Sequence, residues 1–152
     1  MTNIIHRVGV KAPAEKVFAA LSTVAGLSGW WTRDTAGESA VGGAIEFSFA
    51  TPDGEKLGAF TMAVIGLIPN RQVCWRCQAG PPEWIGTEIT FDLAVEDGST
   101  IVLFNHDRWP EQSPFMAHCS TKWATFLLSL KGLVENGNGR PAPDDVKIDN
   151  WN

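Results

Sequence analysis

The most polar short cluster in the sequence is His106-Asp107-Arg108-Trp109, at the end of the last predicted strand, residues 100–108. Side chains on a strand alternate between its two faces, so His106 shares a face with Val102 and Phe104 and is predicted to point inward. An inward histidine can bind a ligand oxygen or transfer a proton. The alternative is a structural histidine, hydrogen-bonded at the end of the sheet beside an Arg/Asp pair.

Cys74 and Cys77 have a C-x-x-C spacing, which can serve redox chemistry or zinc binding. A redox pair normally lies at a helix N-terminus, and a zinc site needs about four ligands. On a strand, positions 74 and 77 point to opposite faces. We therefore predict two small apolar side chains, without a metal site. The odd total of three cysteines lacks a disulfide-framework spacing and is typical of a reducing compartment.

The other polar side chains do not assemble into a recognisable catalytic arrangement. Glu46, Glu88 and Asp92 alternate with apolar strand residues and are predicted to face water. His118 falls on the polar side of the final predicted helix and is expected to be solvated. The pair Gly42-Gly43 lacks the spacing of a phosphate-binding loop. We predict no catalytic residue, no metal and no cofactor.

The aromatic composition is unusual, with seven Trp, eight Phe and no Tyr. Small-molecule pockets are concave and mostly apolar, so these side chains could line a cavity. The alternative is that they fill the core completely. Trp30 and Trp31 are adjacent and could close one end of a cavity. The aromatic residues predicted to face inward are Trp75, Phe91, Phe104, Trp123 and Phe126.

Strand patterns occupy most of the chain. Alternation of apolar and polar residues is clearest from Thr87 to Val95, and the turn signals Pro52-Asp53-Gly54 and Asp97-Gly98 separate neighbouring strands. A short helix is expected to open at Pro13, followed by a second short helix or turn over residues 22–31. Residues 32–43 are small, polar and rich in glycine, and are predicted to form a mobile loop. The six predicted strands span residues 4–10, 44–50, 57–68, 72–78, 87–95 and 100–108.

One long helix is predicted over residues 113–136. Ser113 is a favoured N-cap, Pro114 suits the first helical position and Gly137 suits the C-terminal stop. At 1.5 Å per residue the helix is roughly 36 Å long, enough to cross a sheet. The apolar side of this helix contains Met116, Cys119, Trp123, Leu127, Leu130 and Val134, and the polar side contains His118, Lys122, Thr125, Ser129 and Asn136.

The order of these elements predicts an α+β fold, in which a curved antiparallel sheet of about six strands wraps around the long helix and two short helices accompany it. Sequential strands usually pair, which favours the antiparallel arrangement. We expect a single domain over residues 1–136. Residues 137–152 are rich in Gly, Pro and Asp and are expected to form a loose tail, unless Trp151 docks it.

The composition of the chain indicates which classes of binding partner are disfavoured. The net charge of −5 disfavours a non-specific grip on nucleic acid or on an anionic membrane. The sequence has no apolar stretch of membrane-spanning length and no signal-peptide pattern, so a cytoplasmic location is expected. Exposed aromatic side chains could form a homodimer interface instead of a lid, and the sequence does not distinguish these two alternatives.

Several short motifs follow one another along nearly the whole chain in an order that resembles a known family. They are Ala12-Pro13-Ala14-Glu15-Lys16-Val17-Phe18-Ala19-Ala20-Leu21, Trp30-Trp31, Gly42-Gly43, the turn from Pro69 to Trp75, Trp84-x-Gly86-Thr87, Gly98-Ser99-Thr100 before the strand that ends at His106, and Trp123-x-x-Phe126-Leu127-x-x-Leu130-Lys131. The chain resembles the helix-grip fold of the START-like superfamily (SRPBCC), and within it the activator of heat-shock-protein-ninety ATPase C-terminal-domain-like family.

This resemblance implies a hollow between sheet and long helix, and three functions follow from it. The first is non-catalytic binding of an apolar or aromatic small molecule. The second is an enzyme similar to the cyclases, aromatases or hydrolases of the superfamily, with His106 and Arg108 as acid and base. The third is a chaperone-linked role, for which we expect the chain to lack the additional N-terminal domain. The residues predicted to line the site are Trp30, Trp31, Val73, Trp75, Phe91, Phe104, His106, Trp123 and Leu127, with Trp30 and Trp31 gating it.

Overall fold

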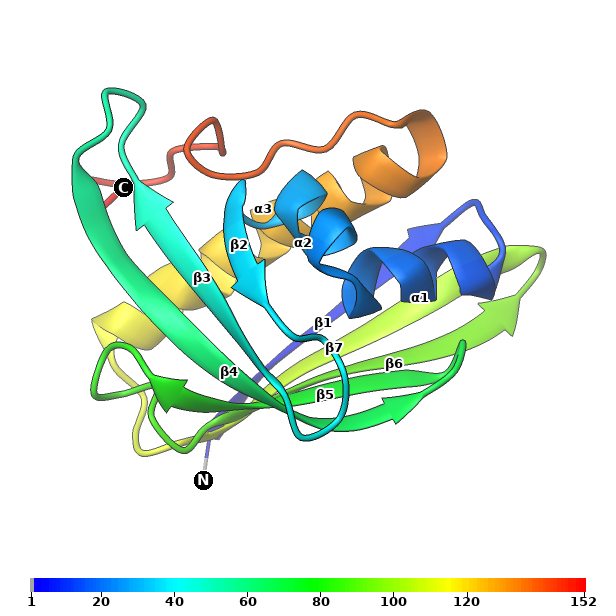
Figure 1. The fold of residues 1–152 in the computed structure, drawn as a ribbon, viewed down its shortest axis with the longest axis horizontal. Helices are drawn as coiled ribbons and strands as arrows, with labels where there is room; N and C mark the ends of the chain where they lie inside the picture. The colour runs from blue at the N-terminus through cyan, green and yellow to red at the C-terminus, as the bar shows by residue number, and fades with distance from the viewer. Residues whose placement is uncertain (1) are drawn as a thin grey trace.

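The computed structural model describes residues 2–152, which form an α+β fold with a curved antiparallel sheet and helices on one side of it (Figure 1). The helices are α1 (Ala14–Ser22), α2 (Val24–Trp30) and α3 (Pro114–Asn136). The strands are β1 (Thr2–Val10), β2 (Asp34–Gly37), β3 (Ala44–Ala50), β4 (Lys56–Ile68), β5 (Gln72–Ala79), β6 (Glu88–Glu96) and β7 (Ser99–Trp109).

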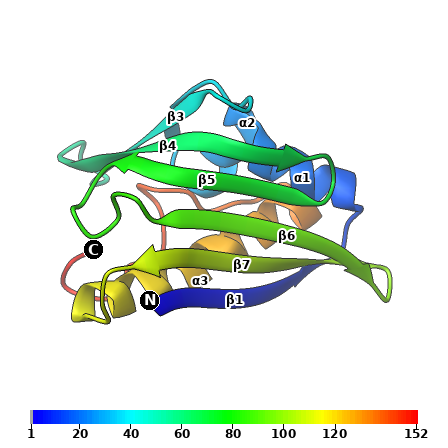
Figure 2. The same ribbon diagram turned by 90° about the horizontal axis from the view of Figure 1, so that it is seen from below.

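The sheet has the strand order β1-β7-β6-β5-β4-β3-β2, and its paired strands are all antiparallel. Hairpin connections build β3 to β7 in sequence, and β1 adds to the far side of β7. Seen from below, the sheet lies in front of the helices, so one of its faces is covered by α1, α2 and α3 (Figure 2). The helix grip predicted from the sequence is confirmed.

The sheet has seven strands, not about six. The additional strand is β2, which lies within the segment predicted to be a mobile loop. It pairs with β3, with Asp34 opposite Ser48 and Gly37 opposite Ile45. β2 is a short edge strand whose side chains are mostly exposed. Because it buries no apolar face, it shows no apolar alternation, and backbone hydrogen bonding alone defines it.

Helix α3 begins and ends where its capping residues predict. The Ser113 hydroxyl accepts a hydrogen bond from the Met116 N–H at 3.2 Å, and Pro114 occupies the first turn. Gly137 has a φ of 75°, in the left-handed region, and its N–H bonds to the carbonyl of Leu133 at 2.9 Å. Lys122 and Ser129, predicted to lie on the polar side of the helix, are buried, because another segment covers that side.

The covering segment is the C-terminal tail, residues 137–152, which runs back along α3 towards the turn that joins β3 and β4 (Figure 1). The Ala142 N–H bonds to the Trp31 carbonyl at 2.8 Å, and the Arg33 N–H bonds to the Ala142 carbonyl at 3.1 Å. The Arg140 N–H bonds to the Ser129 hydroxyl at 2.6 Å. The tail was expected to be loose, but these individual hydrogen bonds hold it against the rest of the fold. Its Gly and Pro content excludes regular structure but leaves these hydrogen bonds available.

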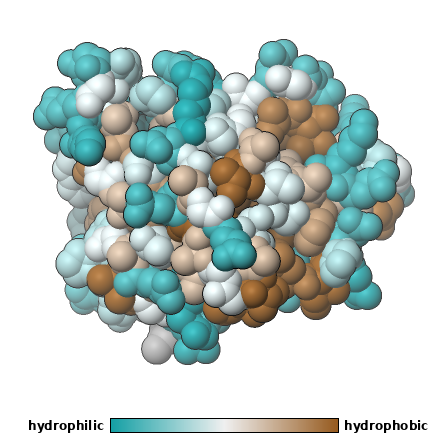
Figure 3. Space-filling model, in the orientation of Figure 1, coloured by the Kyte–Doolittle hydropathy of each residue, from teal (hydrophilic) through white to brown (hydrophobic). Residues whose placement is uncertain are grey.

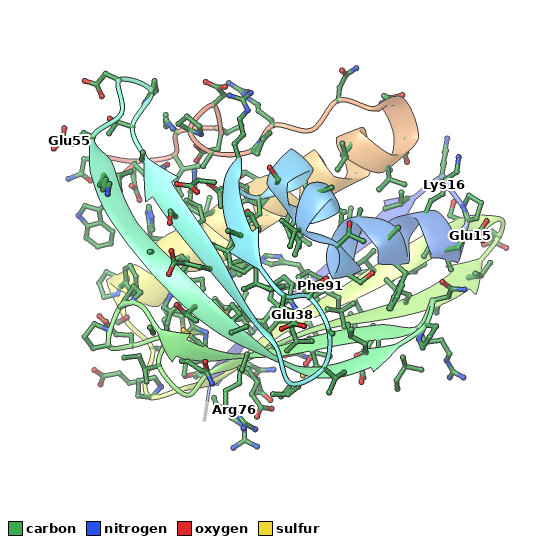
Figure 4. All side chains as sticks on the ribbon, in the orientation of Figure 1. Glu15, Lys16, Glu38, Glu55, Arg76 and Phe91 are labelled. Atoms are coloured by element: carbon green, nitrogen blue, oxygen red, sulfur yellow. The ribbon has the colours of Figure 1, made fainter. Side chains whose placement is uncertain are left out.

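The space between sheet and helices is filled by large side chains. Trp30, Trp75, Trp123, Phe91 and Phe104 are almost completely buried there. Figure 4 shows Phe91 between the sheet and the helices, whereas the labelled charged side chains Glu15, Lys16 and Glu55 project from the periphery.

Within residues 2–152, no helix is long and apolar enough to cross a membrane.

Candidate functional site

A cavity of about 570 Å³ opens at one end of the hollow. Its walls come from Trp31 after α2, the end of β3, the start of β4, the loop between β5 and β6, and the first four turns of α3. The C-terminal tail contributes Asp145 and Asn152. The turn between β3 and β4, the loop between β5 and β6, the start of α3 and the end of the tail lie at the left in Figure 1. The volume falls within the range of about 300–1,000 Å³ typical of small-molecule sites.

The inner wall of the cavity is a stack of aromatic rings. Phe60 and Trp84 are stacked with centroids 4.4 Å apart, and Trp84 lies 5.9 Å from Trp123. Trp31 is 4.9 Å from Trp123 and 6.1 Å from Phe60, which closes the group. Phe49, Phe115 and Phe126 also line the cavity. This wall is preorganised because each ring is held by its neighbours, and it offers flat apolar surface to a ligand.

The exterior at this end of the molecule differs from the cavity lining. Hydrophilic side chains predominate at the upper left of the space-filling view, over the C-terminal tail and the turn between β3 and β4 (Figure 3). Leu57, which is 54% exposed, lines the cavity close to this turn. The aromatic lining therefore faces inward, behind a polar outer surface.

Lys122 is the buried cation of the cavity wall. Its Nζ donates to the Asp145 carboxylate, to the Val146 carbonyl at 2.7 Å and to Asn152 Oδ1 at 2.7 Å. Burial by itself raises the pKa of the Asp145 carboxyl, but hydrogen bonds from Lys122 and Lys147 outweigh it and hold this pKa below its usual value. The three N–H donors of the ammonium thus all have partners, and all three partners belong to the tail.

His118 also lines the cavity, and its side chain is only 12% exposed. It was predicted to be solvated, and the prediction is wrong because the tail packs over it. Nδ1 lies 2.7 Å from the Asp149 carboxylate, which lowers the pKa of Asp149. A carboxylate only accepts, so Nδ1 carries a proton and donates to Asp149. Trp151 lies 5.4 Å from the His118 ring, and the docking of this residue that the sequence left open is observed.

The cysteines have no catalytic environment. Cys119 lines the cavity, but burial raises its pKa to about 12. Burial likewise raises the pKa of Cys77 to about 11. Cys77 is buried on the inner face of β5, whereas Cys74 contacts Thr90 on the other face, as the strand pattern predicts. Residues 2–152 contain no group of three or more His, Cys, Asp or Glu side chains that could hold a metal ion.

His106 points inward, as predicted, but it does not line the cavity. The Trp123 Nε1–H donates to its Nδ1 at 3.1 Å, so the ring proton lies on Nε2, which is 2.9 Å from the Thr87 hydroxyl. Thr87 in turn donates to the Trp84 carbonyl at 2.6 Å. Burial lowers the pKa of His106 to about 3. Both ring nitrogens are occupied and the ring is neutral, which corresponds to the structural interpretation.

Arg108 lies away from His106. It has a positive φ of 68°, which breaks the alternation of β7, so that Arg108 is exposed and Trp109 is buried. Its guanidinium lies 3.6 Å from Glu88, which also binds Arg76 at 2.6 Å. The structure therefore does not bring His106 and Arg108 together, because backbone geometry at a single residue turns the second side chain to the outer face.

The nine residues predicted to line the site divide into two groups. Trp31 and Trp123 line the cavity. The other seven are buried behind it or deeper in the hollow, and they are Trp30, Val73, Trp75, Phe91, Phe104, His106 and Leu127. Trp30, predicted to gate the site, is fully buried and donates its indole N–H to the Ala20 carbonyl at 2.9 Å. It anchors α2 to α1.

The cavity residues not predicted from the sequence come from three kinds of segment. Phe49 and Phe60 are on strands and were recognised only as apolar strand residues. Trp84 lies in a loop, where its large apolar ring next to Pro81-Pro82 was the available signal. His118, Lys122 and Asp145 gave no signal, because each reads as a solvent-facing charge until the tail is placed. The cavity lies nearer the end of the fold than predicted, since large side chains fill its centre.

Comparison with known proteins agrees with this architecture. Residues 11–135 match the model of the family described as Activator of Hsp90 ATPase homolog 1-like protein. The chain belongs to this family. Among curated proteins, none matches the sequence.

Solved structures of similar proteins superpose over most of the chain. The solution structure of the Aha1 dimer from Colwellia psychrerythraea is 47% identical, with 91% of this chain and 100% of that chain covered and a TM-score of 0.79. The AHSA1-like protein from Aeromonas hydrophila is 20% identical, with 90% and 94% covered and a TM-score of 0.71. Protein SSP2350 from Staphylococcus saprophyticus is 18% identical, with 91% and 95% covered and a TM-score of 0.70. The last two share the fold.

Proposed function

We propose that this family member binds an apolar or aromatic small molecule in the cavity at the end of α3, without catalysing a reaction. The observation that carries the proposal is the cavity of about 570 Å³ with a wall of stacked aromatic rings. A planar ligand would bury its faces against Trp84, Trp123 and Phe60, and the apolar area removed from water would drive binding.

The absence of catalysis is proposed from the chemical state of the side chains. The acid/base pair expected for an enzyme of this fold, His106 and Arg108, is separated, and His106 is neutral with both nitrogens hydrogen-bonded. Lys122 has all three donors occupied, and the Cys119 thiol has a pKa of about 12. None of these groups is available as a proton donor, base or nucleophile near neutral pH.

A second copy of the chain is the proposed protein partner. The relative from Colwellia psychrerythraea, 47% identical, is described as a dimer. Native mass spectrometry at several protein concentrations tests the extension to this chain, and a monomer at all of them would contradict it. The chaperone-linked role suggested by the family description is tested by adding the protein to a chaperone ATPase assay, where we expect no stimulation.

Native mass spectrometry of freshly purified protein also tests ligand binding. A mass excess of a few hundred daltons that is lost on denaturation would reveal a non-covalent ligand and its mass. If the protein is purified without a ligand, binding is measured instead with the neutral fluorescent probe N-phenylnaphthylamine. We expect saturable binding of one probe molecule to each chain.

A matched pair of variants locates the binding site. Cys119 lines the cavity, so Cys119→Phe should fill part of it and abolish probe binding while the fold survives. Cys74 contacts Thr90 on the opposite face of β5, so Cys74→Phe makes the same chemical change outside the cavity and should leave binding unchanged. Equal binding by both variants would show that the probe binds elsewhere and would refute the proposal.

A further inference from the structure

The ionisable groups of the cavity wall form an internally compensated set. Apart from the thiol of Cys119, the lining carries three such side chains, His118, Lys122 and Asp145. Lys122 and Asp145 are 8% and 4% exposed and pair with each other. His118 pairs with Asp149 at 2.7 Å. The Lys122 ammonium is therefore balanced by the Asp145 carboxylate of the chain itself, and His118 is hydrogen-bonded to a second carboxylate.

The compensation extends to the hydrogen bonds. The Lys122 ammonium uses its three donors on Asp145, Val146 and Asn152. Asp145 accepts in addition from Lys147 at 2.9 Å and from the Asn152 amide at 3.3 Å. The Nδ1 of His118 is used in the same way, because it donates to Asp149. A ligand anion would thus meet a cation, Lys122, with no free donor.

We infer that the cavity selects uncharged aromatic molecules over aromatic anions, and that Asp145 sets this preference by neutralising Lys122. An anion would have to displace Asp145 from Lys122 or lie unpaired among aromatic rings, and both alternatives are unfavourable. An uncharged ligand needs neither. The inference rests on the proposed function, because it assigns the ligand class of the same cavity.

Two probes with the same aromatic rings test the selectivity. N-phenylnaphthylamine is uncharged, and anilinonaphthalene sulfonate is a permanent anion. The ratio of their dissociation constants is measured by fluorescence titration for each variant. Comparing this ratio between variants removes the difference in solubility between the probes, so only the charge state of the wall changes.

Asp145→Asn leaves the Lys122 charge uncompensated in the wall. We expect the ratio to shift by about tenfold towards the sulfonate. Asp144→Asn is the matched control, because it makes the same change in net charge at the adjacent position, where Asp144 pairs with the exposed Arg33 and does not line the cavity. We expect no shift in the control. Equal ratios in the two variants would overturn the inference.

A second variant gives an independent result if Asp145→Asn does not fold. Lys122→Met removes the cation and leaves the Asp145 carboxylate, so the ratio should shift by about tenfold in the opposite direction, towards the uncharged probe. No shift would also overturn the inference. The proposed binding function and the proposed charge selectivity can be refuted independently. Insensitivity of both probes to Cys119→Phe refutes binding in the cavity, whereas cavity binding with unchanged ratios refutes only the selectivity.

Discussion

The indole Nε1–H of Trp123 donates a hydrogen bond to Nδ1 of His106 over 3.1 Å, and both side chains are buried. This bond selects the tautomer in which Nε2–H donates to Thr87, whose hydroxyl donates to the Trp84 carbonyl. Trp123 and Trp84 both line the cavity. His106 on β7 therefore connects two parts of the aromatic wall from behind, and its role is to position them.

Loss of this histidine should destabilise the protein. His106→Ala leaves the Trp123 indole without an acceptor and creates a cavity in the core, so we expect the free energy of unfolding to fall by about 2–4 kcal/mol. Urea denaturation at pH 7.5, followed by tryptophan fluorescence, measures it. His6→Ala is the control, because His6 is only partly buried and bonds to the Ser120 carbonyl at 3.0 Å. We expect a loss of about 1 kcal/mol there; equal losses would contradict the role of His106.

The low pKa of His106 also predicts acid sensitivity. Its pKa is about 3 in the folded protein, against a value of 6.5 for an unperturbed histidine, because burial disfavours the charged ring. Between these pH values the unfolded chain binds a proton that the folded chain does not, so stability falls as the pH decreases from 6.5 towards 3. The slope from this group is about 1.4 kcal/mol per pH unit.

His106→Gln provides the test of this pH dependence. The variant lacks the titrating group but keeps His6 and His118, so their contributions cancel in the comparison. We expect a flatter dependence of unfolding free energy on pH between 4 and 6 than in the unmodified protein. Parallel curves would show that His106 is not the group responsible.

The buried ion pair at the tail predicts a large effect of removing one partner. Lys122→Met leaves the Asp145 carboxylate buried and paired only by the more exposed Lys147, at a cost of about 3 kcal/mol. We also expect faster hydrogen exchange in residues 140–152, because the ammonium binds this segment at three points. Lys16→Met changes an exposed lysine of α1 that projects from the surface, and it should alter stability by less than about 0.5 kcal/mol (Figure 4). Unchanged exchange in Lys122→Met would contradict the anchoring role.

The N-cap of α3 supports the same end of the fold. Ser113→Ala removes the acceptor of the Met116 N–H and should cost about 1 kcal/mol, measured by thermal or urea denaturation. The first turns carry Phe115, His118 and Cys119, so fraying should also weaken probe binding. Ser113→Asp keeps an acceptor at the cap and should retain both stability and binding. Equal loss in both variants would exclude capping as the cause.

Local patterns in the sequence were sufficient for most of the fold. Alternation identified six strands, and Ser113, Pro114 and Gly137 defined the ends of α3. The opposite orientations of Cys74 and Cys77 followed from the same period. These features are predictable because hydrogen bonding and side-chain direction within a strand or helix depend on residues close in sequence. β2 was missed because its pairing with β3 involves the backbone and leaves no apolar pattern.

The cavity depended on the tertiary structure. Trp75, Phe91 and Phe104 could either fill the hollow or line a cavity in it. The outcome depends on how side chains from strands far apart in the sequence pack together, and the periodicity of a single strand does not reveal this. These three side chains fill the hollow, and the remaining space lies at the end next to Phe60, Trp84 and the tail.

The state of the polar groups depended on the tertiary structure as well. By itself, the sequence determined that His106 points inward and that Lys122 lies outside the apolar stripe of α3. Only the folded chain decided that Trp123 and Thr87 occupy both nitrogens of His106, and that Asp145, 23 residues further along, covers Lys122. The physical reason is that charge and hydrogen-bond compensation join groups far apart in the chain, and helix or strand periodicity carries no information about such partners.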